Sequence, residues 1–213
     1  MRVTLWAGAF AVVLGARLVA AQLSVDALAG TSFSVPSRLS IYQSGQPTLR
    51  FTAHYSTKPL DDTPYFVVRI GLWKNNTAWL LDLIHHKLYL DNPPPEVEYF
   101  RITYGFNIVS VGRAWRKGGL VYSAGLGAVF THASSSVRGR PYLGTGGPFN
   151  KGYTVTGASV LGGAEYRIGL GEGSYLALDG KLSVAYVQVH VSRGEAHVPN
   201  AALHLSAGVG VQF

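Results

Sequence analysis

The chain has no cysteine, few charged side chains and only one long apolar run. Without cysteine, a disulfide framework and every thiolate reaction or thiolate metal site are excluded. The 18 Lys and Arg exceed the 11 Asp and Glu only modestly and are scattered, which argues against a nucleic-acid partner. Beyond the N-terminus, no apolar stretch reaches the roughly 20 residues of a membrane-spanning helix.

The one long apolar run is typical of a signal peptide. Met1-Arg2 gives a positive start, Thr4–Gly15 an apolar core, and Val19-Ala20-Ala21 the small residues that a signal peptidase recognises. We therefore expect residues 1–21 to be a signal peptide that is cleaved before Gln22. No cysteine follows it, so a lipid anchor is excluded.

What the chain does have is alternation, most clearly in Leu203–Phe213. Its odd positions carry Leu, Ala, Val and a terminal Phe, and its even positions are polar or glycine. A soluble barrel would turn the apolar face inward, whereas an outer-membrane barrel turns it toward lipid. Because the other faces of similar segments carry charges, we expect the lipid-facing arrangement.

Seven further segments share this pattern: Thr48–Ser56, Tyr65–Trp73, Ala78–Leu90, Val97–Trp115, Gly119–His132, Tyr153–Ile168 and Ser174–Val191. Several exceed the roughly 9–11 residues that cross a membrane, so they are expected to project beyond it. In two of them the residues predicted to face lipid are Phe66, Val68, Ile70 and Leu72, and Phe100, Ile102, Tyr104, Phe106 and Ile108.

Connection lengths and aromatic residues predict the sidedness of this barrel. Short connections alternate with longer ones, which include Thr57–Pro64, Ala133–Gly152 and Ser192–Asn200. Short periplasmic turns and long external loops are typical of outer-membrane barrels. Seven aromatic residues fall near the predicted periplasmic turns and predict an interfacial girdle: Trp73, Trp79, Trp115, Tyr122, Tyr166, Tyr175 and Phe213.

The segment 22–46 is less regular. Ala27–Val35 and Arg38–Tyr42 each have strand-like composition, separated by Pro36. Counting both gives ten strands, and counting neither gives eight strands after an N-terminal arm or extra hairpin. We expect an all-β, antiparallel up-and-down transmembrane barrel of eight strands in residues 47–213, preceded by the arm.

The terminal strand resembles the C-terminal signal recognised by the outer-membrane assembly machinery, because it ends on Phe213 after apolar residues at every second position. From Thr48 onward the pattern resembles the small eight-stranded outer-membrane barrels typified by the OmpA transmembrane domain and OmpX. This resemblance implies a bacterial outer-membrane location. The partners it implies are membrane lipid, lipopolysaccharide and the assembly machinery, and it implies no particular activity.

The predicted lumen of an eight-stranded barrel is just wide enough for side chains. Charges there must be paired, because an isolated buried ion costs several kcal/mol. Alternation predicts a lumen charge network of Arg50, Arg69, Asp82, Arg113, Glu165, Arg167, Asp179 and Lys181. It also places His54, His86 and His204 inward at similar heights, and imidazoles on adjacent strands are candidate metal ligands. We otherwise expect no cofactor.

The candidate catalytic residues are His132 and Ser134. Thr131-His132-Ala133-Ser134 is similar to the His-x-Ser arrangement of lipid A deacylases, in which a histidine base activates a serine nucleophile. The sequence departs from that family because no Glu lies between Glu98 and Glu165 to orient the histidine. We therefore expect a non-enzymatic envelope protein with a structural or surface-interaction role. The alternatives are a lipid A-modifying acyl hydrolase or acyltransferase, and a narrow solute channel.

Overall fold

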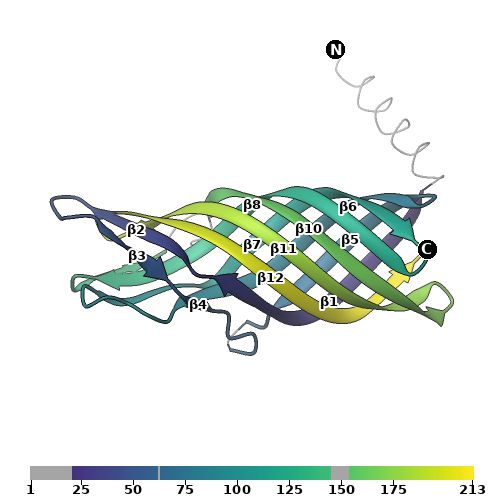
Figure 1. Ribbon diagram of the computed structural model, residues 1–213, viewed down its shortest axis with the longest axis horizontal. Coiled ribbons are helices and arrows are strands. Elements are labelled where there is room, and N and C mark those ends of the chain that lie inside the picture. The colour runs from purple at the N-terminus through teal and green to yellow at the C-terminus, as the bar shows by residue number, and fades with distance from the viewer. Residues whose placement is uncertain (1–20, 62, 145–153) are drawn as a thin grey trace, which may run out of the picture.

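The computed structural model describes residues 21–61, 63–144 and 154–213, which form an antiparallel β-structure (Figure 1). The strands in these residues are β1 (Gln22–Val35), β2 (Ser37–Gln43), β3 (Leu49–Ala53), β4 (Tyr55–Ser56), β5 (Phe66–Lys74), β6 (Thr77–Leu90), β7 (Val97–Lys117), β8 (Leu120–Val137), β9 (Arg140–Leu143), β10 (Thr154–Gly171), β11 (Ser174–Val191) and β12 (Gly194–Gln212). No helix long and apolar enough to cross a membrane occurs among them. The expected signal peptide lies outside the described residues except for Ala21.

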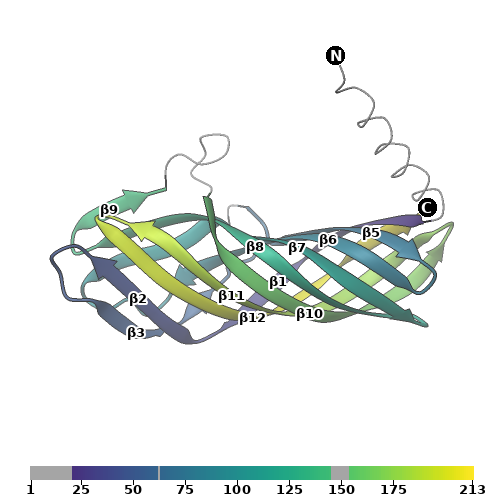
Figure 2. The ribbon, with the colours of Figure 1, turned by 90° about the horizontal axis from the view of Figure 1, so that it is seen from above.

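Eight of these strands close into a barrel (Figures 1 and 2). The order around the ring is β1, β5, β6, β7, β8, β10, β11 and β12, and β12 pairs again with β1. The closing seam is long, from Ser24 opposite Gln212 to Val35 opposite Ala201. The predicted antiparallel barrel of eight strands is confirmed.

The strand that closes the ring is β1, so the prediction that Thr48–Ser56 does so is wrong. Val25 lies opposite Val211 of β12 on one side and Ile70 of β5 on the other. The segment expected to be an arm therefore supplies a barrel strand. Pro36 obscured this in the sequence, because proline cannot donate a ladder hydrogen bond and separates β1 from β2.

Beyond Pro36 the chain continues along β12, with which β1 also pairs. β2 pairs with the start of β12, with Gln43 opposite Gly194, and forms a hairpin with β3. β4 then pairs with the end of β6. Together with β9, which pairs with β8, these short strands lengthen the barrel at one end, seen at the left of Figure 1.

Two regions of this long barrel differ in what faces inward. We call the ring from the short turns up to Tyr186 of β11 the lower barrel. The part beyond it, made of β2, β3, β4, β9 and the adjoining strand ends, we call the upper extension. In β11, Leu178 and Leu182 of the lower barrel are 46% and 61% exposed, while Asp179 and Lys181 are buried. In the upper extension Val187 and Val189 are buried instead, and Gln188 is exposed.

The apolar interior of the upper extension corrects one predicted face of β7. Phe66, Val68, Ile70 and Leu72 of β5 point outward as predicted, but Phe100, Ile102, Phe106 and Ile108 are buried in the core cluster. Nothing is described of the Tyr104 side chain. The predicted outward direction of these residues was wrong, because an apolar face turns inward where the outside is water. A register shift between Ile102 and Phe106 also interrupts the alternation of β7.

The predicted long external connection Ser192–Asn200 is also wrong. β12 begins at Gly194, so Ser192 and Arg193 alone link it to β11. Ala196 and Val198 point into the extension and Glu195 is exposed. Most of these residues form a strand with an apolar inner face. In the other predicted long connection, Ala133–Gly152, residues 145–152 lie outside the described residues.

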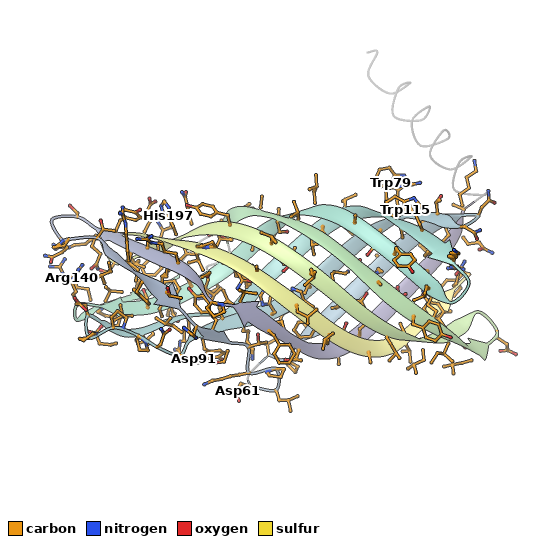
Figure 3. All side chains as sticks on the ribbon, viewed as in Figure 1. Asp61, Trp79, Asp91, Trp115, Arg140 and His197 are labelled. Carbon is orange, nitrogen blue, oxygen red and sulfur yellow. The ribbon has the colours of Figure 1, made fainter. Side chains whose placement is uncertain are left out.

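The two-residue link between β11 and β12 lies in the upper extension, and the three predicted short turns lie at the opposite end, where Phe213 is found, as Figure 1 shows. They follow β5, β7 and β10, and Asn75 in the first has the positive φ of 56° that tight hairpin turns require. Five girdle residues are exposed on the outside: Trp79, Trp115, Tyr122, Tyr166 and Phe213. Figure 3 shows Trp79 and Trp115 at this end. The other two, Trp73 and Tyr175, are buried, so their assignment to the girdle was wrong.

Candidate functional site

The lower barrel is filled by a charge network centred on Arg69. Its Nε donates to Asp82 Oδ1 at 2.8 Å, one terminal nitrogen donates to Glu165, and the other donates to Asp179 Oδ1 at 3.0 Å. Arg69 is 1% exposed. The planar guanidinium presents donors in a fixed fork, which suits it to hold several carboxylates at once.

Two further cations complete the network. Lys181 pairs with the second oxygen of Asp82, and Arg167 Nε donates to Glu165 Oε1 at 2.5 Å. Arg167 also lies 3.6 Å from Asp26. Arg69, Arg167 and Lys181 thus face four carboxylates, so the buried charges are nearly balanced.

The network is sealed toward the turn end by aromatic residues. Trp73 Nε1 donates to Ser24 Oγ at 2.9 Å, and its ring lies 4.1 Å from the Arg116 guanidinium and 5.0 Å from that of Arg167. The Tyr175 hydroxyl donates to Asp26. Cations over an indole face are favourable by about 0.5–2 kcal/mol, so this layer stabilises the closed end.

Gly210 of the terminal strand has a steric role in that layer. A Cβ at Gly210 would lie 2.1 Å from Asp26 Oδ1 and 2.4 Å from the Tyr175 ring. Glycine on the inner face of β12 therefore leaves room for the Asp26–Tyr175 pair. Sequence reasoning missed Asp26 because β1 was assigned to the arm, although the alternation of Leu23, Ser24, Val25 and Asp26 was visible.

The structure brings together six of the eight residues predicted for the lumen charge network: Arg69, Asp82, Glu165, Arg167, Asp179 and Lys181. Arg50 is instead exposed on β3. Arg113 lies on the outer face, where its guanidinium is 4.8 Å from the Trp79 ring. Both belong to segments whose inward face was predicted wrongly.

A polar layer of histidine and hydroxyl side chains separates the charge network from the apolar core. The His204 ring lies 3.2 Å from the Tyr65 hydroxyl through Nδ1 and 2.8 Å from Ser183 Oγ through Nε2. His86 lies edge-on to it, with ring centroids 5.1 Å apart, and contacts Ser32 Oγ. Both histidines are buried.

The third predicted histidine is not in this layer. His54 lies between β3 and β4 and is exposed, and its backbone amide donates to Asn92 Oδ1. Within the described ranges, no three His, Asp or Glu side chains are grouped so that they could hold a metal ion. The three-histidine ligand set is therefore wrong, and only His86 and His204 lie together.

The predicted catalytic pair lies on β8 at the base of the upper extension. Ser134 is 4% exposed, and its hydroxyl accepts a hydrogen bond from Arg101 Nε at 3.0 Å. Ser134 also lies opposite Leu143, where β9 covers β8. A buried serine held by an arginine donor is poorly placed to attack a lipid ester.

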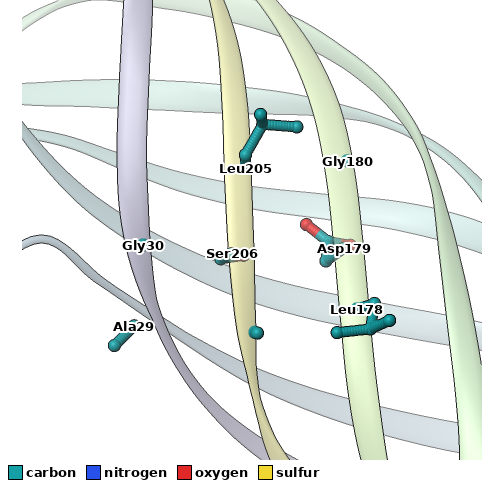
Figure 4. Close-up of a pocket in the computed structure, with 8 residues that line it drawn as sticks. Ala29, Gly30, Leu178, Asp179, Gly180, Leu205 and Ser206 are labelled. Atoms are coloured by element: carbon teal, nitrogen blue, oxygen red, sulfur yellow. The ribbon is translucent and has the colours of Figure 1, made fainter.

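One small cavity lies inside the lower barrel. The cavity beside Asp82, Ser110 and Lys181 has a volume of about 10 Å³, which is roughly the space of one water molecule. A larger depression of about 510 Å³ lies where β1, β12 and β11 meet, and Ala29, Gly30, Leu178 and Leu205 line it (Figure 4). It is shallow and open to the outside because glycine and alanine leave little side chain there.

Comparisons with known proteins identify the fold. No protein-family model and no curated protein matches the chain. Among solved structures, outer membrane protein AlkL, determined in lipid bilayers, is similar at 13% identity over 91% of this chain and 90% of that one, with a TM-score of 0.53. The chain is an outer-membrane-type β-barrel.

Two other solved structures are similar over most of their length. Ail, the attachment invasion locus protein of Yersinia pestis, has 10% identity over 89% of this chain and 97% of its own, with a TM-score of 0.41. Neisserial surface protein A has 15% identity over 91% and 97%, with a TM-score of 0.40. The likeness to AlkL, at 13% identity, shows the fold and not the role of this barrel.

Proposed function

We propose that this protein is a closed, non-enzymatic barrel of the bacterial outer membrane that acts through its upper extension at the cell surface. A signal peptide ending at Ala21 would deliver it, and the assembly machinery would recognise the strand ending at Phe213. The observation that carries the proposal is the reversal of apolar and polar faces between the two regions. A lipid-facing lower barrel and a water-facing extension are what a surface-displayed protein requires.

The filled lumen supports a structural role rather than transport. Arg69 joins three carboxylates across the barrel, and the core cluster fills the extension above. Moving a solute through this interior would separate charges that are 1–7% exposed. Breaking a buried pair typically costs about 3–5 kcal/mol.

The upper extension is held together as a surface for contact with other molecules. Arg138 donates to Gln43 Oε1 at 3.0 Å and to the Pro47 carbonyl at 2.9 Å, which ties the β8–β9 turn to the β2–β3 hairpin. Glu98 accepts from the Gly139 amide at 2.9 Å. This hydrogen bond lowers the pKa of the exposed Glu98 carboxyl, so the link persists in mild acid. A rigid surface loses little conformational entropy when it binds.

The location and sidedness are tested by cysteine labelling, because the chain has no cysteine of its own. Thr52→Cys lies on the exposed face of β3, and Lys117→Cys lies at the turn end. On intact cells a membrane-impermeant maleimide is expected to label the first and to spare the second until the outer membrane is permeabilised. Equal labelling of both on intact cells would contradict the proposed orientation.

The absence of transport and catalysis is tested separately. Refolded protein is expected to give no steady conductance in a planar bilayer. Lipid A from cells with and without the gene is expected to have the same acyl chains by mass spectrometry. A change in acyl number that Ser134→Ala abolishes would establish the lipid A-modifying alternative, and stable channels would establish the transport alternative.

A further inference from the structure

The outer face of the lower barrel carries an arginine in a mostly apolar surface. Arg113 lies on β7 between Val111 and Trp115, which are 55% and 47% exposed and point the same way. It stands two residues further from the turn than Trp115 and directly opposite Trp79, so it lies at the level of the aromatic girdle. A cation on the lipid face costs about 0–1 kcal/mol near the interface and more toward the membrane centre.

The strand registers show which residues surround Arg113. Arg113 is opposite Trp79 on β6 and Ala124 on β8, and Ala124 is in turn opposite Gly162 on β10. The next row toward the membrane centre is apolar and bulky, with Val111 opposite Leu126 and Leu126 in line with Val160. Ala124 and Gly162 beside Arg113 therefore protrude less from the barrel surface than Val111, Leu126 and Val160 in the next row.

This difference in side-chain size produces a groove of about 440 Å³ on the outside of the barrel. It is lined mainly by Trp79, Val111, Arg113, Ala124, Leu126 and Val160. One end carries the arginine and the indole, and the rest is apolar. The groove opens to the outside of the lower barrel, where the proposed membrane places lipid chains.

The charge of Arg113 is not neutralised by the protein. Across the described part of the chain, the Arg113 guanidinium lies 4.8 Å from the Trp79 ring, and the ion pairs join other residues. Carboxylates on neighbouring strands, such as that of Asp82 on β6, point into the lumen and are already paired. A guanidinium in this position favours a bidentate oxyanion partner, and a phosphate supplies one.

We propose that this groove binds one glycerophospholipid of the periplasmic leaflet. The phosphate lies on the Arg113 guanidinium, and an acyl chain lies over Ala124 against Val111, Leu126 and Val160. Trp79 holds the guanidinium by its ring face and contacts the glycerol region, as indoles do at membrane interfaces. This inference rests on the proposed outer-membrane location, because only there does the groove face lipid.

Native mass spectrometry of the refolded protein tests the proposal, with dioleoyl phosphatidylglycerol as the probe and dioleoylglycerol as the chain-matched lipid without phosphate. Wild type is expected to retain one phosphatidylglycerol and no dioleoylglycerol. Arg113→Gln is expected to lower the affinity for phosphatidylglycerol about tenfold or more, since a charge-assisted pair contributes about 1.5–3 kcal/mol. Ala124→Leu, which fills the groove, is expected to lower it while Arg113 stays in place.

Two controls separate this site from general lipid contact. Arg101→Gln removes an arginine of the same strand in the upper extension, and Ala207→Leu fills the separate depression of Figure 4. Both are expected to bind as wild type does. Equal retention by wild type and Arg113→Gln, with both folded by heat-modifiable gel migration, would overturn the proposal. Such a failure would leave the labelling result for outer-membrane location unaffected, so the two proposals fail separately.

Discussion

The lower barrel and the upper extension share long strands such as β11, but the apolar and polar faces of such a strand are exchanged between the two regions. Along β11 the outward residues change from Leu182 to Gln188, and the inward residues change from Lys181 to Val187. Strand pairing and period are unchanged. In the proposed location, lipid accepts apolar side chains on the outside of the lower barrel, whereas water drives them inward in the extension.

The comparison also explains why the two interiors need different chemistry. In the lower barrel the lumen is too narrow for bulk water, and its polar residues are paired around Arg69. In the extension, Ile41, Phe100 and Ile102 pack as in a soluble protein. The histidine layer at His86 and His204 lies between them. The following predictions test this division.

The largest effect is expected from Arg69→Met in the lower barrel. Removing the guanidinium leaves Asp82, Glu165 and Asp179 close together without their shared cation, so we expect a loss of about 3–5 kcal/mol in unfolding free energy. Urea unfolding of protein refolded in vesicles, followed by tryptophan fluorescence, measures it. Arg50→Met on the exposed face of β3 is the matched control, with a change within about 0.5 kcal/mol. Similar losses in both would mean that the network does not hold the barrel.

An intermediate effect is expected where the two regions meet along β11. Leu182→Lys places a charge on the lipid face and should destabilise by about 2–4 kcal/mol, whereas Gln188→Lys on the same face of the extension should change little. The same unfolding measurement in vesicles compares them. If Gln188→Lys were as costly as Leu182→Lys, the membrane boundary would lie above Tyr186 and the extension would be shorter than proposed.

The smallest effect is expected at the turn end. Trp73→Phe removes the indole hydrogen bond to Ser24 and weakens the contact with Arg116, so we expect a loss of about 1–2 kcal/mol. Brominated lipids test the same assignment by fluorescence. They should quench the fluorescence of Trp79 and Trp115 but not that of Trp73. Single-tryptophan variants retaining one of the three provide the comparison. Strong quenching of Trp73 would show that its side chain faces lipid.

The sequence by itself determined the class of fold and much of the lower barrel. Eight strands were predicted, but Thr48–Ser56 stood in the place of β1. Alternation fixed outward faces in β5, β11 and β12, and the charges at Arg69, Asp82, Glu165 and Asp179 marked the inner ones. The short turns and the exposed aromatic residues marked one end. These features are local, because side chains in a strand alternate with a period of two whatever the neighbouring strands are.

Only the tertiary structure decided which strand closes the ring and where the apolar face changes direction. The assignment of β1 depends on pairings with β12 about 180 residues away in sequence, and its continuation into β2 is hidden by Pro36. The inward direction of Phe100 and Ile102, and the exposure of His54, depend on height above the membrane. Alternation gives two faces but does not say which solvent each will meet, and that choice depends on how far each strand extends beyond the lipid.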